Sequence, residues 1–202
     1  TAGGNLGTDV RGSAGTGIQT AALSIGGKSS PPVTTKTEEY DGSSWTNGGA
    51  LGTARYRLAA AGTVPAGLAF SGIPGPSGND GPDKTISEEY DGSSWTSSGS
   101  MNTGKFFMAI GGTGTQTAAL ASGGSSGPST TVTAITETYD GTAWATNPSM
   151  GTARYYLAGG ASGTTSAALV MGGANAAETK QNATEEFTGV TETIVAKTLT
   201  TS

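Results

Sequence analysis

Carboxylates recur in this sequence at a regular spacing, and they are the first residues that could carry chemistry. An acidic residue stands two positions before an aromatic ring in four places: Glu38, Glu88, Glu137 and Glu185. Two facing carboxylates could act as general acid and base, as in a glycosidase. Four equivalent copies placed along an array are structural by nature, however, so we expect these glutamates to serve the fold.

The inventory of side chains argues against most enzyme chemistry. The chain has no histidine and no cysteine. A Ser-His-Asp triad, a thiolate nucleophile and a histidine-based zinc or copper site are therefore excluded. We expect a protein that is not an enzyme and needs no cofactor. The alternative is a carbohydrate-active enzyme that uses carboxylates only, for which Asp80 and Asp83 are isolated candidates.

The loop that carries these aspartates, Gly78-Asn79-Asp80-Gly81-Pro82-Asp83, offers oxygen ligands and a glycine, as a calcium loop would. It lacks the spacing of a known calcium motif and occurs once. We therefore expect a solvated turn and no metal, and we keep Asn79, Asp80 and Asp83 as candidates for a binding surface.

Basic residues stand where they could neutralise the repeated glutamates. Arg55, Lys105 and Arg154 each lie near the start of a repeating unit. A buried carboxylate is costly unless it is paired and hydrogen-bonded. We expect these three residues to pair with the repeated glutamates.

One nine-residue motif organises the whole chain. Glu-Glu-Tyr-Asp-Gly-Ser-Ser-Trp-Thr runs from Glu38 to Thr46 and recurs unchanged from Glu88 to Thr96. Looser copies follow around Tyr139 and Phe187, so the repeat is about 50 residues long. A period of this size built from strand-like pieces is typical of a β-propeller or a similar array.

Each repeat divides into four pieces of strand length. In the second repeat these are 55–62, 68–72, 85–90 and 94–101, with Asp-Gly as a hairpin signal between the last two. No helix-period segment of useful length is present. We expect one all-β domain over residues 1–202. Its units are approximately 7–51, 52–101, 102–150 and 151–202, and residues 1–6 are either the end of a preceding unit or a closing strand.

The double glycine that ends the second strand, the Tyr of the third and the Trp about five residues later resemble the kelch repeat. The basic residues after Thr53-Ala54 and Thr152-Ala153 fit the same pattern. The resemblance implies a propeller of four-stranded blades around a central channel. Kelch rings usually have more blades than the four units seen here, so part of a larger ring, or a ring completed between chains, is an alternative. The amino-acid sequence of the repeat is also similar to that of kelch-like virion proteins of aquatic bacteriophages.

Composition limits the partners. The formal net charge is −5 and no basic cluster exists, so neither a nucleic acid nor an anionic membrane is an expected partner. No apolar run is long enough to span a bilayer. A cysteine-free, acidic chain rich in Gly, Ser, Thr and Ala suits an extracellular or virion location.

Two sets of aromatic residues have different expected roles. One set repeats in register and is expected to pack between blades: Tyr40, Trp45, Tyr90, Trp95, Tyr139 and Trp144. A sugar-stacking platform is the alternative for these rings. The other set varies between units and is a better candidate for an exposed binding surface: Tyr56, Phe106, Phe107, Tyr155 and Tyr156.

We therefore expect a structural or adhesive propeller that presents its most divergent loops to a partner. These loops are 28–36, 73–84, 125–133 and 174–181. Expected partners are other virion or filament proteins, a second copy of the chain, or a glycan on a host surface. A protein-interaction scaffold of the intracellular kelch kind is the remaining alternative.

Overall fold

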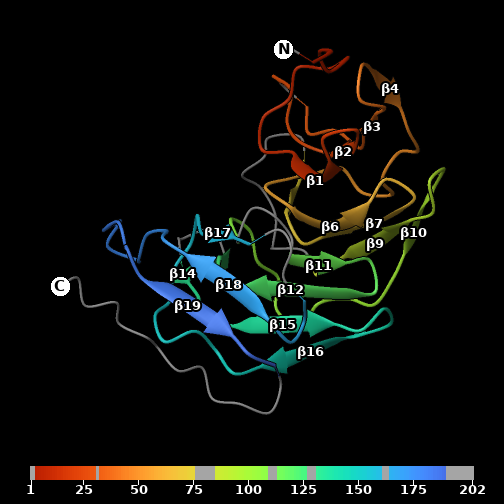
Figure 1. Ribbon diagram of the computed structural model, residues 1–202. Helices are drawn as coiled ribbons and strands as arrows, with labels where there is room; N and C mark the ends of the chain where they lie inside the picture. The colour runs from red at the N-terminus through yellow and green to blue at the C-terminus, as the bar shows by residue number, and fades with distance from the viewer. Residues whose placement is uncertain are drawn as a thin grey trace.

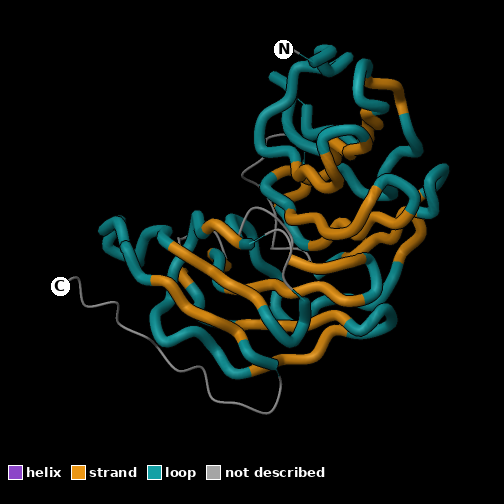
Figure 2. Tube along the Cα trace, in the orientation of Figure 1, coloured by secondary structure: helices purple, strands orange, loops and turns teal. Residues whose placement is uncertain are grey.

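The computed structural model is all-β. It describes residues 3–30, 32–75, 85–108, 113–126, 131–160 and 164–189, and none of these residues is helical. Figure 2 shows short strands joined by long connections throughout. Four small antiparallel sheets are arranged as the four blades of a β-propeller, which confirms the expected fold class (Figure 1). No helix among the described residues is long and apolar enough to cross a membrane.

Each blade follows the same order along the chain. The first blade consists of β1 (Ala14–Ile18), β2 (Ala21–Ile25), β3 (Thr37–Tyr40) and β4 (Trp45–Asn47). The second consists of β6 (Ala59–Thr63), β7 (Ala66–Phe70), β9 (Ser87–Tyr90) and β10 (Trp95–Ser97). The third consists of β11 (Thr113–Thr115), β12 (Ala118–Ser122), β15 (Thr136–Tyr139) and β16 (Trp144–Asn147). In the fourth, the described strands are β17 (Ala158–Gly159), β18 (Ala168–Met171) and β19 (Thr184–Phe187).

The start of each unit differs from the strand expected there. Residues 55–62 do not form one strand, because Arg57 adopts a left-handed conformation with φ of 56°. Residues before that point form β5 (Arg55–Tyr56), which pairs with β8 (Ile73–Pro74) in a separate ladder. In the third unit the equivalent pairing is the single bridge between Phe106 and Ser125, and β13 (Ser125–Ser126) pairs in turn with β14 (Thr131–Val132). Single bridges, Arg11 to Lys28 and Tyr155 to Ala174, take this place in the first and fourth units.

The Asp-Gly hairpins close the outer pair of strands. Tyr40 lies opposite Trp45 in the ladder of β3 and β4, so residues 41–44 form the loop. Gly42 has φ of 96°, which a residue with a side chain rarely adopts. The Asp41 Oδ1 atom accepts the backbone N–H groups of Ser43 and Ser44 at 2.8 Å. These donors, with Ser44 contributing most, hold the pKa of Asp41 well below its usual range.

Adjacent blades pack through small residues on one side and larger ones on the other. Leu23 of the first blade lies against Gly67 of the second, where an added Cβ atom would come within 2.9 Å of the leucine methyl. Two apolar clusters fill these junctions. The first joins Leu23, Ile25, Ala69 and Tyr90, and the second joins Leu68, Phe70, Ala119, Ala121, Tyr139 and Trp144.

Backbone hydrogen bonds also tie neighbouring units together at the double-glycine step. The N–H of Gly27 donates to the carbonyl of Arg55 at 2.8 Å, and Gly124 donates to Arg154 at 2.8 Å. Gly27 has φ of 105°, so the step needs a residue without a side chain. The repeated glycines therefore bring each strand end close to the start of the next unit.

Residues 3–6 lie beside the hairpin of the first blade. The N–H of Gly4 donates to the carbonyl of Ser43 at 3.1 Å. The last part of the expected unit 151–202, from residue 190 onward, lies outside the described residues.

Candidate functional site

The repeated carboxylates form buried ion pairs within their own units. Glu88 lies 2.9 Å from Arg55, Glu185 lies 2.6 Å from Arg154, and Glu137 lies 3.5 Å from Lys105. The basic groups also donate to backbone carbonyls, for example Arg55 to Ser71 at 2.8 Å. The expected pairing is therefore present in three units.

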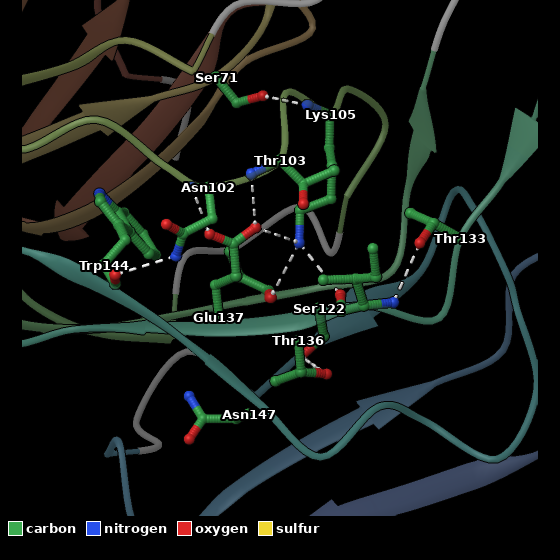
Figure 3. A network of polar contacts seen from close by, with 12 residues as sticks. Ser71, Asn102, Thr103, Lys105, Ser122, Thr133, Thr136, Glu137, Trp144 and Asn147 are labelled. Carbon is green, nitrogen blue, oxygen red and sulfur yellow. Dashed lines mark hydrogen bonds and ion pairs between the residues drawn. The ribbon is translucent and has the colours of Figure 1, made fainter.

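Each glutamate also binds the chain segment that leads into its unit. The backbone N–H groups of Gly7, Gly52, Asn102 and Gly151 donate to the carboxylates of Glu38, Glu88, Glu137 and Glu185 at 2.6–2.7 Å. In the third unit, Figure 3 shows Glu137 between Lys105 and residues 102–103. Burial lowers the pKa of Lys105 to about 8, although Glu137 opposes the change.

This environment assigns the carboxylates a structural role. All four glutamates and their three cationic partners are buried. Most of their lone pairs and protons bond to the chain itself, and the Nε groups of Arg55 and Arg154, which lack a partner, are buried. The positions of the glutamates explain the strict spacing of the motif. Each glutamate lies on the third strand of a unit and accepts a hydrogen bond from the segment with which that unit begins.

The repeated aromatic rings of the second and third blades lie between blades. Tyr90 donates its hydroxyl proton to Glu39 of the preceding blade, and Tyr139 donates to Glu89 at 2.5 Å. Trp95 and Trp144 donate their indole N–H groups to Thr37 and Ser87, each at 2.9 Å. Tyr40 and Trp45 of the first blade stack on each other with ring centroids 5.0 Å apart and are partly exposed.

The second set of aromatics forms a group of side chains in mutual contact. Together with one arginine these side chains form what we call the aromatic cluster: Tyr56, Arg57, Phe106, Phe107, Tyr155 and Tyr156. Tyr56, Phe106 and Tyr155 are buried, whereas Phe107 and Arg57 are half-buried and Tyr156 is 49% exposed. The accessible part of the cluster thus consists of Arg57, Phe107 and Tyr156.

The accessible side chains contact one another across three units. The Arg57 guanidinium lies 4.1 Å from the ring centroid of Phe107 and 4.8 Å from that of Tyr56. The rings of Phe107 and Tyr156 are 4.1 Å apart. The guanidinium and the two aromatic rings therefore form a row. Such a row suits stacking against a flat apolar surface such as a sugar ring.

Three of the five described non-glycine residues with positive φ belong to the cluster, and the other two are Ser71 and Glu178. Arg57, Phe107 and Tyr156 have φ of 56°, 53° and 55°, and Gly12 holds the equivalent place in the first unit with φ of 64°. A left-handed residue with a large side chain costs roughly 1–2 kcal/mol relative to a normal conformation. Such strain concentrates at functional sites. The conformation turns each side chain outward between two buried neighbours.

The four divergent loops begin beside this cluster. Bridges place Lys28 beside Arg11, Phe106 beside Ser125 and Tyr155 beside Ala174, while Tyr56 pairs with Ile73. The Lys28 ammonium lies 5.7 Å from the Tyr56 ring. The parts of the loops that the structure describes therefore surround the aromatic cluster.

One member of the cluster was missed by sequence reasoning. Arg57 follows the buried pair Arg55–Tyr56 and was not among the expected binding residues. Its alignment with Gly12, Phe107 and Tyr156 was the available signal, because a glycine at one copy of a repeat position indicates positive φ at the others. The remaining candidates Asn79, Asp80 and Asp83 lie outside the described residues. Neither a protein-family model nor a curated protein matches the chain in sequence.

Proposed function

We propose that this propeller is a non-enzymatic adhesive module, and that the aromatic cluster binds a glycan on a host surface. The observation that supports this most is the row of Arg57, Phe107 and Tyr156, which is exposed in part and held in a strained conformation. Stacking of sugar rings on aromatic faces, with hydrogen bonds from a guanidinium, is a common mode of carbohydrate binding. The surrounding loops would provide selectivity.

The wider setting is an exposed position on a virion. The resemblance of the repeat to kelch-like proteins of aquatic bacteriophages supports this setting, and the rigid sheets suit a particle component that must hold its loops in place. Capsid decoration and a tail or fibre component are both compatible with such a module.

A glycan array tests the proposal directly. The chain is applied to immobilised bacterial surface polysaccharides and sialylated or uronic-acid-containing glycans, alongside the variants Phe107→Gly and Tyr156→Gly. We expect binding to at least one glycan class and a loss of roughly two- to tenfold in each variant, since one stacked aromatic contributes about 0.5–1.5 kcal/mol.

The matched control is Ser97→Gly, which changes an exposed residue of β10 away from the cluster. Its binding should equal that of the unchanged chain. Binding that survives both glycine substitutions would place the recognition surface elsewhere, and no binding to any glycan or host cell would remove the adhesive function.

A further inference from the structure

Successive blades meet through two complementary faces. In the first blade, one face carries Ala22, Ser24, Tyr40 and Trp45, which are neighbours in the ladders of β2, β3 and β4. We call the corresponding face of each blade its ring face. The opposite side, the acceptor face, carries Leu23, Ile25, Thr37 and Glu39 in the first blade. The acceptor face of one blade contacts the ring face of the next.

The first two junctions use the same pair of hydrogen bonds. At each junction the tyrosine of the ring face donates to a glutamate, as Tyr139 does to Glu89 at 2.5 Å. The tryptophan donates to a hydroxyl, as Trp144 does to Ser87 at 2.9 Å. Small residues of the ring face receive larger apolar ones, as Gly67 receives Leu23.

The third junction loses both members of the tyrosine–glutamate pair together. The fourth blade has Phe187 in place of tyrosine, and the third blade has Thr138 in place of glutamate. A carboxylate buried against a phenyl ring would lose its hydrogen bond and be destabilising. The glutamate on an acceptor face is therefore present where a tyrosine faces it.

Two faces remain outside these three junctions. The acceptor face of the fourth blade carries Leu169, Met171, Thr184 and Glu186, which are neighbours in the ladder of β18 and β19. It has both the glutamate and the hydroxyl. The ring face of the first blade has both Tyr40 and Trp45, and a hollow of about 490 Å³ lies beside Trp45, Ala22 and Ser24.

Exposure shows that these two faces are not covered as the others are. Leu169, Met171 and Thr184 are half-buried and Glu186 is exposed, whereas the equivalent Leu23 and Ile25 are buried. Tyr40 is partly exposed, whereas Tyr90 and Tyr139 are buried. Residues 3–6 nevertheless pass beside the Tyr40 hydroxyl just as residues 48–49 pass beside that of Tyr90. The surroundings of a complete junction are thus in place.

We propose that the acceptor face of the fourth blade docks on the ring face of the first blade in a second copy of this chain. Tyr40 then donates to Glu186, and Trp45 donates to Thr184. The fourth blade of the same chain is the other conceivable occupant. However, Glu186 is exposed and Tyr40 and Trp45 are partly exposed in the folded chain, so the fourth blade of the same chain does not cover the ring face of the first. Figure 1 shows these two blades at opposite ends of the arrangement.

The contact is heterologous, since two different surfaces meet. Two copies joined at both ends would form one ring of about eight blades, at the upper end of the usual range for propellers. If the rotation does not close after two copies, the same contact yields longer assemblies. The inference does not depend on the proposed glycan binding.

Sedimentation velocity over a concentration series tests the contact. The chain should sediment as a dimer or larger assembly and dissociate on dilution. Tyr40→Phe and Glu186→Gln should each raise the dissociation constant roughly tenfold or more, because each disrupts a charge-assisted hydrogen bond. Glu178→Gln, which removes the same charge from an exposed residue elsewhere, should leave it unchanged. A monomer at every concentration, or an assembly indifferent to Tyr40→Phe and Glu186→Gln, overturns the proposal.

Cross-linking separates a second copy from closure by the same chain. The chain contains no cysteine, so Tyr40→Cys and Glu186→Cys can be prepared singly and mixed with a short bismaleimide, at a protein concentration well above the dissociation constants of Tyr40→Phe and Glu186→Gln. A covalent dimer in the mixture is expected. The double variant Glu89→Cys/Tyr139→Cys, at an internal junction, should cross-link within one chain and serves as the positive control. If Tyr40→Cys/Glu186→Cys in one chain cross-links only internally, and the mixed single variants yield no dimer, the fourth blade of the same chain is the occupant and the proposal fails.

Discussion

Lys105 occupies the position that arginine occupies in the second and fourth units. Arg55 and Arg154 each donate to two backbone carbonyls and one glutamate at 2.6–2.9 Å. Lys105 lies 3.5 Å from Glu137 and 3.0 Å from the carbonyl of Ile135. A compact ammonium serves this site less well than the planar guanidinium, which donates in several directions.

Lys105→Arg is therefore expected to stabilise the protein by about 1 kcal/mol near pH 7, because the guanidinium gains charge-assisted hydrogen bonds. Chemical denaturation with fluorescence detection measures the difference. A loss of stability in Lys105→Arg would show that the third unit has no room for the larger group.

The stability of the unchanged protein and that of Lys105→Arg should also respond differently to pH. The pKa of Lys105 falls from its ordinary value of 10.5 to about 8 in the folded state, so between these values the unfolded chain binds more protons. The unchanged protein consequently gains stability relative to Lys105→Arg as the pH rises from 8 toward 10. A constant difference over that range would contradict the depressed pKa.

At the scale of single elements, the hairpin loops show why the motif is strictly repeated. Gly42, Gly92 and Gly141 have φ between 92° and 96°, and each follows an aspartate that caps the loop. In the last unit Thr188 replaces the aspartate, but Gly189 keeps φ of 101°. The backbone conformation is thus the stricter requirement of the loop.

Gly92→Ala should consequently destabilise the protein by about 1–2 kcal/mol, because an L-residue rarely adopts this φ. Thermal unfolding followed by circular dichroism checks the value. Ser97→Ala, at an exposed position in β10, is the control and should have little effect. Equal melting temperatures for both variants would show that the loop can change its turn type.

The sequence predicts the elements of the blades better than the ladders beside them. Alternating strands and Asp-Gly turns recur with the period, and β9 (Ser87–Tyr90) forms within the expected strand 85–90. The break at Arg57 could not be read from the residue itself, because arginine carries no preference for positive φ. Likewise, Glu39 and Glu89 look like part of a polar motif, and their contact with the tyrosine of the next blade depends on how blades stack.

At the scale of the whole molecule, stability depends on rings that span the junctions. Trp144 of the third blade lies 4.9 Å from Phe70 of the second and 5.1 Å from Tyr139, measured between ring centroids. It is buried, whereas Trp45 and Trp95 are half-buried. The motif therefore contributes unequally along the array.

Trp144→Ala should cost about 3–5 kcal/mol, as expected for truncation of a buried aromatic, and should exceed the cost of Trp95→Ala. Denaturant unfolding of the two variants tests the order. A larger loss for Trp95→Ala would mean that burial does not determine the contribution of these rings.

The repeated motif and the aromatic cluster have separate roles in the molecule. The motif supplies ion pairs, turns and junctions, whereas Arg57, Phe107 and Tyr156 remain strained and accessible beside the divergent loops. Residues that serve recognition can be removed without loss of the fold, since relief of strain offsets the contacts they lose.

The most direct test is the free energy of unfolding of Tyr156→Gly. The substitution removes stacking worth about 1 kcal/mol per ring pair and relieves a left-handed tyrosine worth roughly as much. We predict a stability within about 1 kcal/mol of the unchanged protein. A loss of more than about 2 kcal/mol would show that the cluster is part of the scaffold, and would contradict its assignment to recognition.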